Sequence, residues 1–314
     1  MKNKTFLVTG GTGFIGSNIC KLLIKKNYRV KIFDNNLRGN LNNIKKIKKK
    51  IKFIKGDIRN SDALIRASRN TDAVIHLAYI NGTKYFYTKP VLVLDVAVKG
   101  IINVIEACMK NGIKELYLAS SSEVYQTPNK IPTDEHESLK IPNIFNPRYS
   151  YGGGKILTEL MGVHYGKKYF KKMVIFRPHN VYGPNMGYEH VIPEFINRFR
   201  KMKKKSKKFI IKGNGNETRS FIFIDDFISS FDLILKKGKH LDIYNIGTTE
   251  RIKIRDLAIK ISKFFKKKII LHRAKIARGS TRHRCPNISK ITKLGFKKKY
   301  NLNAGLSKTI NWYN

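Results

Sequence analysis

The stretch from Thr5 to Gly16 constrains the fold more than any other part of the chain. It opens with a short apolar run and is then broken by glycines at positions 10, 13 and 16. In a turn that binds a dinucleotide, one glycine permits the bend, one lets the backbone approach a pyrophosphate, and one lets the helix pack closely on the strand. The following helix would present unpaired N–H groups to the phosphates. Alone, such a triplet is as typical of an ordinary turn as of a dinucleotide-binding turn.

Short apolar strands alternate with helical stretches through the first half of the chain. Strands are predicted at 28–33, 51–54, 73–77, 115–119 and 173–176, and helices at 91–109 and about 150–169. This alternation is typical of βαβ units, and with right-handed crossovers it predicts an α/β fold with a doubly wound parallel sheet. Ligands of such sheets bind beyond the carboxyl ends of the strands, where the motifs described below lie.

Two carboxylates follow predicted strands and are candidates for contacts to a nucleotide. Asp34 ends the second strand, where its side chain can accept both ribose hydroxyls of an adenosine and repel a 2′-phosphate. This position favours NAD over NADP, and the nearby Arg38 is the one residue that argues the other way. Asp57 follows the third strand and is predicted to contact the adenine side. Either carboxylate could instead be a turn residue.

The candidate catalytic residues lie after the fifth predicted strand and in the helix that follows. Tyr151 and Lys155 are four residues apart, so a helix places them on one face. A free tyrosine has a pKa of about 10, and a nearby cation lowers it by favouring the phenolate. A serine at 120–122 could hydrogen-bond a substrate oxygen. Alone, the pair is typical of a surface contact and the serines of a loop. Together, after a nucleotide-binding half, they predict a catalytic site.

The composition favours a globular protein with reduced thiols. The chain has 314 residues, 41% of them hydrophobic, and no apolar run of the roughly 20 residues that span a membrane. Its three cysteines, Cys20, Cys108 and Cys285, fit no metal or redox spacing. We therefore expect a cytoplasmic protein without a metal site.

The chain is very basic, with a formal net charge of +43. Lysine runs occur at 45–50, 201–208, 266–268 and 297–299. Such a charge could attract nucleic acid or an anionic membrane. Because the runs are scattered and have few aromatic residues beside them for base stacking, we interpret them as solvated surface and expect neither partner.

Taken in order, the motifs resemble those of the extended short-chain dehydrogenase/reductases, within the NAD-dependent nucleotide-sugar epimerase/dehydratase family. The resemblance runs from about residue 4 to Trp312-Tyr313. The matching segments are 10–16, Gly56-Asp57-Ile58, His76-Leu77-Ala78, Ser121-Ser122-Glu123-Val124-Tyr125, Tyr151 with Lys155, 177–184, 213–215 with 218–221, Asp225-Asp226, and Tyr244-Asn245-Ile246-Gly247.

The resemblance implies a fold, a cofactor and a site. The fold would be a Rossmann domain at 1–178 plus about 221–245, with a smaller domain for the nucleotide sugar at about 179–220 and 246–314. The cofactor would be NAD, held by Gly10, Gly13, Phe14, Ile15, Gly16, Asp34, Asn35, Asn36, Asp57, Ile58, Leu77, Ala78, Tyr151, Lys155, His179 and Val181. The catalytic residues would be Tyr151, Lys155, Ser121, Ser122 and Glu123, and the substrate would contact Asn180, Arg219 and Arg284. Helices near 90–110 and 150–170 would form a homodimer interface.

The resemblance also implies chemistry through a 4-keto sugar, with Tyr151 taking the proton from the C4 hydroxyl and Ser121 holding its oxygen. Epimerisation at C4, 4,6-dehydration, decarboxylation of a uronate and net dehydrogenation stay open. Glu123 discriminates among them, because dehydratases and decarboxylases of the family carry glutamate there, as do some epimerases. A role in surface-polysaccharide synthesis is implied by family alone. A protein of another class, a non-catalytic NAD sensor or a nucleic-acid-binding protein, would not need Tyr151, Lys155 and Ser121.

Several residues depart from the family pattern. Tyr79 replaces a usual small residue after His76-Leu77-Ala78, and Gly153 and Gly154 replace bulkier ones before Lys155. The insert at 81–87 is expected to reshape the sugar pocket. These departures predict a subfamily with an unusual substrate.

Overall fold

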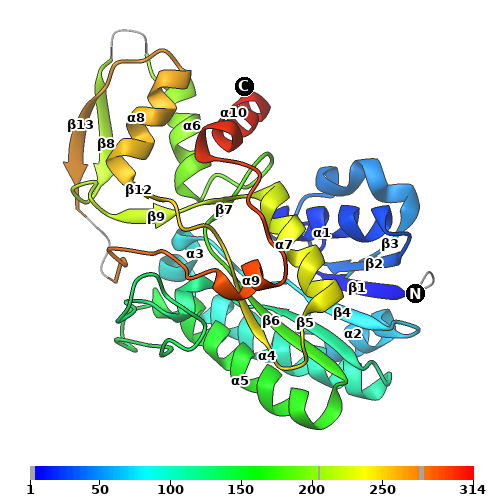
Figure 1. The fold of residues 1–314 in the computed structure, drawn as a ribbon. Coiled ribbons are helices and arrows are strands. Elements are labelled where there is room, and N and C mark those ends of the chain that lie inside the picture. The colour runs from blue at the N-terminus through cyan, green and yellow to red at the C-terminus, as the bar shows by residue number, and fades with distance from the viewer. Residues whose placement is uncertain (1–3, 204–205, 276–278) are drawn as a thin grey trace.

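The computed structural model describes residues 4–203, 206–275 and 279–314. Its centre is a seven-stranded sheet in the order β11-β6-β5-β4-β1-β2-β3, in which every neighbouring pair is parallel (Figure 1). The strands are β1 (Thr5–Thr9), β2 (Arg29–Asp34), β3 (Ile51–Lys55), β4 (Ala73–His76), β5 (Glu115–Ala119), β6 (Lys172–Pro178) and β11 (Ile243–Ile246). The strands predicted from the sequence are thus confirmed to within two residues at each end, and β11 joins them at the edge beside β6.

Helices cover both faces of this sheet because side chains alternate along each strand. On one face, Phe6 and Val8 of β1 pack with α1 (Phe14–Lys25) and α7 (Ile224–Lys237). On the other, Leu7 packs in a core with α2 (Ser61–Ser68), α4 (Pro90–Lys110) and α5 (Tyr149–Tyr169). The 3₁₀ segments η1 (Leu41–Lys50) and η2 (Ser122–Val124) follow β2 and β5, and α3 (Thr83–Thr88) precedes α4. This is the doubly wound α/β arrangement that the alternation predicts.

A smaller lobe lies beyond the carboxyl ends of the strands, above the sheet in Figure 1. Its helices are α6 (Val191–Lys201), α8 (Ile254–Phe264) and α10 (Leu302–Tyr313), and α9 (Ser289–Lys293) packs against β11. Its short strands pair as β7 (Val181–Tyr182) with β10 (Ile222–Phe223), β9 (Thr218–Ser220) with β12 (Arg251–Lys253), and β8 (Lys208–Lys212) with β13 (Ile270–Ala274). Aromatic side chains build its core, where Phe199 stacks on Phe209 at 4.2 Å between ring centroids.

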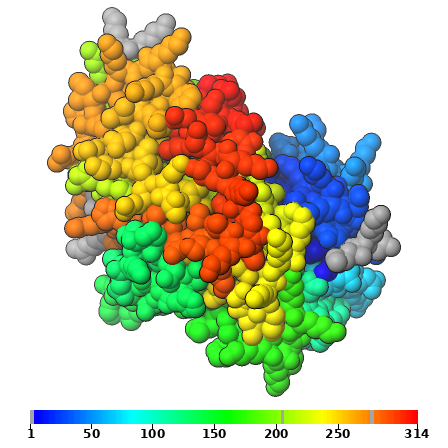
Figure 2. All heavy atoms as spheres, viewed as in Figure 1, coloured from blue at the N-terminus to red at the C-terminus, as the bar shows by residue number. Residues whose placement is uncertain are grey.

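The chain crosses between the two lobes more than once. After β6 it enters the small lobe, and it returns through β10 and α7 to β11 before entering the small lobe again (Figures 1 and 2). The two lobes are therefore joined by several segments, and the space between them is bounded by residues far apart in sequence. Among the described residues, none of the helices is long and apolar enough to cross a bilayer.

Candidate active site

The glycine turn lies between β1 and α1 and has very little room for side chains. Gly10 has φ +72°, and a Cβ there would lie 2.7 Å from the backbone nitrogen of Ala78. A Cβ on Gly16 would lie 2.2 Å from the carbonyl oxygen of Gly10, so α1 begins in contact with the turn. Gly13 is the N-cap residue of α1, and no described side chain caps the helix or puts a negative charge in its first turn. The first N–H groups of α1 can therefore donate hydrogen bonds to the phosphates of a dinucleotide.

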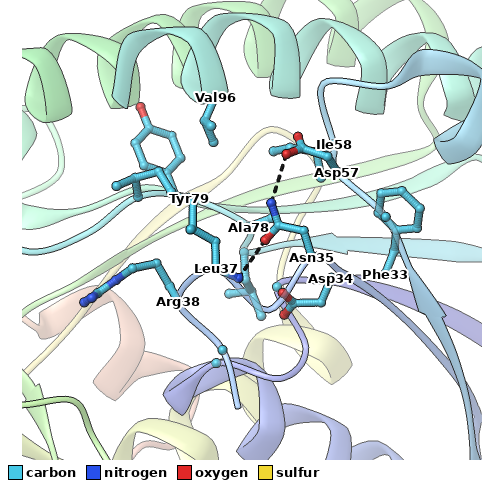
Figure 3. A pocket seen from close by; sticks show the side chains of 16 residues that line it. Phe33, Asp34, Asn35, Leu37, Arg38, Asp57, Ile58, Ala78, Tyr79 and Val96 are labelled. Carbon is cyan, nitrogen blue, oxygen red and sulfur yellow. Dashed lines mark hydrogen bonds between the residues drawn. The ribbon is translucent and has the colours of Figure 1, made fainter. Parts of the chain in front are cut away.

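A cavity opens beside this turn, at the ends of β1, β2 and β4 (Figure 3). Its lining includes Gly10, Gly13, Asp34, Asn35, Asp57, Ile58, Leu77, Ala78 and Tyr79. Eight of the sixteen predicted cofactor-binding residues thus line one cavity. The fit to a dinucleotide rests on the uncapped helix N-terminus and on a glycine cradle that any Cβ would fill. Phe14, Ile15 and Gly16 form the first turn of α1 next to it.

The Asp34 carboxylate is buried and held in place at the edge of this cavity. It accepts hydrogen bonds from Thr12 N at 3.0 Å and Thr12 Oγ1 at 2.6 Å, and its other oxygen accepts from Asn36 N at 2.9 Å. Asn35 donates to Asp57 at 2.9 Å, as drawn in Figure 3. Hydrogen bonds from Arg59 lower the pKa of Asp57 to about 2, so Asp57 is ionised. These contacts fix a negative edge where an adenosine ribose would lie.

Arg38 does not serve a 2′-phosphate in this arrangement. Its guanidinium donates to both carboxylate oxygens of Glu189, at 2.9 and 3.1 Å, and lies 4.6 Å from the ring centroid of Tyr85. Figure 3 shows its side chain pointing away from Asp34. Arg38 lines the cavity but is paired with Glu189, and the selection of NAD by Asp34 stays a prediction.

Ser121, Tyr151 and Lys155 come together where β5 ends against α5. The Tyr151 side chain is buried, which raises the pKa of its phenol, and a hydrogen bond from the Ser121 hydroxyl opposes part of that rise. Lys155 Nζ donates to the carbonyl oxygen of Ala119 at 2.6 Å and lies 5.9 Å from the ring centroid of Tyr151. The predicted catalytic residues of β5 and α5 thus form one cluster.

The electrostatics of this cluster differ from the expectation that Lys155 alone would make Tyr151 acidic. Burial is the largest influence on Tyr151 and raises the pKa of its phenol above the ordinary value, with Glu123 adding to the rise. Burial also lowers the pKa of the Lys155 amine to about 7, against the opposing attraction of Glu159. Desolvation disfavours both charged forms, so the protein side chains alone keep Tyr151 a phenol.

Glu123 lies beside this cluster and is tied to arginines. Arg284 Nη1 and Nη2 lie 2.6 and 2.8 Å from the two oxygens of Glu123, and Arg148 Nη2 lies 3.5 Å from one of them. These cations lower the pKa of the Glu123 carboxyl to about 2, although burial works in the opposite direction. Ser121 is the N-cap of η2, and its hydroxyl accepts from Glu123 N at 3.2 Å, while Ser122 is buried in that 3₁₀ turn. The sequence analysis did not single out Arg148.

A second cavity of about 490 Å³ lies between Glu123 and the small lobe. Asn180, Val181, Arg219 and Arg284, all predicted as ligand contacts, line it. Arg219 donates to the carbonyl oxygens of Thr218, Thr281 and Arg282 at 2.7–3.1 Å, and burial beside Arg284 lowers its pKa to about 9. A cluster of buried guanidinium groups with one carboxylate favours an anionic ligand.

A buried polar network lies next to the cluster of Ser121, Tyr151 and Lys155, and it was not predicted from the sequence. Arg177 donates to both oxygens of Glu159, at 2.8 and 2.5 Å, and to Tyr125 Oη at 2.7 Å. Ser120 also donates to Glu159, and Tyr125 donates to Asn245 at 2.8 Å.

His179, predicted to contact the cofactor, belongs to the same network. Its Nε2 lies 3.0 Å from Asn245 Oδ1, and its side chain is 2% exposed. It lines neither of the two cavities. Its Nδ1 is buried without a hydrogen-bond partner among the described residues, and the predicted contact to the cofactor stays a prediction. The described residues hold no cluster of side chains that could bind a metal ion.

Comparisons with known proteins agree with this arrangement. The model of the NAD dependent epimerase/dehydratase family matches residues 6–247. The chain is 33% identical over 267 residues to dTDP-D-glucose 4,6-dehydratase of Dictyostelium discoideum, a match that covers 81% of this chain and 61% of that relative's own length. It is 32% identical to human dTDP-D-glucose 4,6-dehydratase, over 99% of this chain and 90% of the relative.

Solved structures show the same fold along the whole chain. The UDP-N-acetylglucosamine 4-epimerase of Methanobrevibacter ruminantium, in complex with UDP-N-acetylmuramic acid, superposes with a TM-score of 0.88 at 27% identity, covering 100% of this chain and 99% of that one. The UDP-glucose 4-epimerase of Thermus thermophilus in complex with NAD gives a TM-score of 0.88 at 25% identity, covering 98% of each chain. With the glycine turn, the serine–tyrosine–lysine cluster and the arginine-lined cavity in one molecule, the chain belongs to the NAD-dependent epimerase/dehydratase family.

Proposed function

We propose that this protein oxidises a nucleotide sugar at C4 with NAD and carries the 4-keto sugar on to an epimer or a dehydrated product. The observation that carries the proposal is the position of Tyr151. The ring of Tyr151 contacts Tyr79, which lines the cavity beside the glycine turn. The charge of Glu123, which lines the arginine-bearing cavity, raises the pKa of Tyr151. A group that removes a proton while hydride is transferred must lie between cofactor and substrate in this way.

Each residue of the cluster has a defined task in the proposed reaction. Tyr151 takes the proton of the C4 hydroxyl, and Ser121 donates a hydrogen bond to the oxygen. Bound beside the glycine turn, NAD would supply the acceptor for the hydride that leaves C4. Lys155 favours the phenolate of Tyr151 by its charge. Burial opposes both charged forms, so this proposed role of Lys155 works against desolvation.

The fate of the 4-keto sugar depends on Glu123. Elimination requires a base at C5, and a base works best when its pKa is close to the operating pH. The pair with Arg284 holds the pKa of Glu123 at about 2, which makes it a weak base. This supports C4 epimerisation, in which the ketone is reduced again on its other face. The 4,6-dehydratase activity is the second candidate, supported by the ionised Glu123 beside Tyr151 and by the names of the relatives.

The substrate's diphosphate would bind in the second cavity. Arg219 and Arg284 line it from β9 and from the segment before α9. Arg148 lines it from the N-cap of α5, and Asn180 from the segment between β6 and β7. We place the division between the cofactor domain and the sugar domain at the limits expected from the sequence, with 221–245 on the cofactor side. The reaction is proposed to supply sugars for surface polysaccharides in the cytoplasm, a setting that rests on family membership alone.

A homodimer through α4 and α5 is also proposed. The two helices pack against each other, and both keep exposed apolar side chains on their outer faces. These side chains are Val91, Leu94, Ile102 and Met109 of α4 and Leu160 and Tyr165 of α5. Because α4 is apolar both toward the sheet and away from it, its outer face is suited to bury against a second copy.

The test is to incubate the purified protein with UDP-, GDP- and dTDP-sugars and to follow the products by NMR. A 4-epimer would support the first candidate, and a 4-keto-6-deoxy sugar the second. Tyr151→Phe should lower turnover by on the order of 10²–10⁴-fold while leaving NAD binding intact, because it removes only the proton acceptor. Absence of turnover for all sugars, in a protein that also fails to bind NAD, would contradict the proposal.

A further inference from the structure

Two departures from the family pattern are in contact in the structure. Tyr79 follows β4 where a small residue is usual, and Gly154 lies in α5 where a bulkier residue is usual. A Cβ on Gly154 would lie 2.2 Å from the hydroxyl oxygen of Tyr79 and 2.6 Å from the Cβ of Ala97. The side chain of Tyr79 therefore fills the space between α4 and α5 that a side chain at Gly154 would otherwise occupy. The glycine in the middle of a helix, a destabilising residue there, has a packing reason.

Tyr79 lies directly against both members of the catalytic pair. Lys155 Nζ lies 3.7 Å from the centroid of the Tyr79 ring, much closer than its 5.9 Å distance to the Tyr151 ring. The Tyr79 ring meets Tyr151 edge to face, with centroids 5.1 Å apart and an interplanar angle of 85°. Phe86 of α3 stacks on Tyr151 at 4.8 Å. Tyr151 is thus held between two aromatic rings, only one of which also faces Lys155.

The Tyr79 hydroxyl does not account for the residue's presence. Its oxygen is buried without a hydrogen-bond partner among the described residues. A buried hydroxyl without a partner costs stability. The ring face is then the useful part of the side chain, since a cation gains most from an aromatic face when both are shielded from water.

We propose that Tyr79 is a positioning residue that holds the Lys155 ammonium against its ring face and fixes one side of the Tyr151 ring. The proposal rests on the proposed function insofar as it assigns Lys155 and Tyr151 to the reaction. Tyr79 acts through these two residues and does not itself exchange a proton. In this chain, the ring face offsets part of the penalty that burial places on the charged lysine.

The groups around Lys155 determine what a pH measurement will report. Glu159, one turn along α5, favours the charged amine. His76 of β4 is buried, its Nδ1 lies 2.8 Å from Thr9 Oγ1, and burial keeps its pKa near 3, so it is neutral. Tyr79 and Tyr151 face the amine with their rings. A change at Tyr79 alone leaves the charges of the other groups in place.

The experiment measures the protonation of Lys155 without any substrate. An NMR titration between pH 5 and 10 of protein with isotope-labelled lysine side chains follows the carbon beside Nζ of the buried Lys155 and gives the pH at which half of that amine is neutral. Tyr79→Leu removes the ring face, and we expect this midpoint to fall by on the order of one pH unit. Tyr79→Phe keeps the face and should keep the midpoint. Phe86→Leu is the matched control, because Phe86 contacts Tyr151 and has no ring contact with Lys155.

A midpoint in Tyr79→Leu equal to that of the wild type would overturn the proposal. Should that variant fail to fold, Tyr79→Met fills more of the space, and the same shift is expected. Where a substrate is known, the descending limb of the kcat profile at high pH should move down with the midpoint, with KM nearly unchanged. If no nucleotide sugar is turned over by the wild type, the proposed function fails, and the titration still decides the role of Tyr79.

Discussion

At the scale of single residues, the site shows how burial controls charge. Tyr151 and Lys155 are both enclosed, and desolvation pushes their pKa values apart in the direction that keeps each neutral. The sequence motif predicts which residues meet, but it contains no information on how much water reaches them. A pKa expected from a pairwise attraction can therefore have the wrong direction in a dry site.

The unpartnered hydroxyl of Tyr79 leads to a prediction about stability. Tyr79→Phe removes a buried oxygen without a hydrogen bond and keeps the ring that packs on Lys155 and Tyr151. We expect the variant to be more stable by about 1 kcal/mol, measured by urea unfolding at pH 7. A variant that loses stability would show that the hydroxyl has a partner, such as a buried water molecule.

The pair of Glu123 and Arg284 predicts how stability depends on pH. The pKa of Glu123 in the folded protein, about 2, lies below the ordinary value of 4.5, so its contribution is complete above pH 4.5 and is lost as the pH falls toward 2. Glu123→Gln should be less stable at pH 6, because Arg284 and Arg148 are then left without their carboxylate. The difference between wild type and variant should shrink between pH 4.5 and 2 in urea unfolding. A constant difference over that range would contradict the assigned pairing.

At the scale of elements, the ends of strands and helices determine where the ligands lie. The glycine turn sets α1 against β1, and the approach is closest at Gly16. Gly16→Ala should abolish NAD binding measured by calorimetry, because a Cβ 2.2 Å from a backbone oxygen must move the first turn of α1. Gly112→Ala is the control. Gly112 has φ +65° and no atom near its missing Cβ, so only backbone strain of about 1 kcal/mol is expected there, with NAD binding retained. NAD binding that survives in Gly16→Ala would contradict the assigned role of the turn.

The network behind the cluster joins β5, α5 and β6 through the pair of Arg177 and Glu159. Both side chains are nearly fully buried, at 2% and 5% exposed. Glu159→Gln leaves the arginine charge without its partner and should lower the free energy of unfolding by about 3–5 kcal/mol. The exposed helical pair of Arg198 and Glu194 provides the control, since Glu194→Gln should change the free energy of unfolding by less than about 0.5 kcal/mol. Equal effects of the two variants in urea unfolding would rule out a supporting role for the network.

At the scale of the whole molecule, the positive charge and the exposed apolar side chains bear on what the protein binds. The net charge of +43 is spread over the chain, and the described arginines that gather in a cavity lie in the proposed substrate site. The helices α4 and α5 instead carry apolar side chains that are exposed at the surface. The positive charge attracts anions, and the exposed apolar side chains favour association with a second copy of the chain.

The proposed homodimer is tested at the exposed apolar side chains of α5. Leu160 is 53% exposed on α5, and Leu160→Lys places a charge where the two copies would meet. We expect sedimentation velocity to show a dimer for the wild type and a monomer for this variant. Ile270→Lys, at a similarly exposed position on β13 in the small lobe, should remain a dimer. A wild type that sediments as a monomer at tens of micromolar would contradict the interface.

The sequence by itself determined the parts of this protein that depend on local pattern. The glycine spacing, the alternation of strands and helices, and the fourfold spacing of Tyr151 and Lys155 predict β1 and α1, the parallel sheet and the catalytic pair, because each arises from backbone geometry within a few residues. The strand β11 pairs with β6 at the sheet edge, a pairing between segments far apart in sequence. The sequence indicated the motif at 244–247 but did not predict this strand.

Only the tertiary structure decided what those residues face. It tied Glu123 to Arg284, turned Arg38 toward Glu189, buried His179 in a polar network and placed Tyr79 in the space that Gly154 leaves open. In each case the partners are far apart in sequence, and the outcome depends on packing and on exclusion of water. The glycine turn therefore predicts from sequence alone where the cofactor binds, whereas the charges and contacts around the proposed catalytic residues required the folded chain.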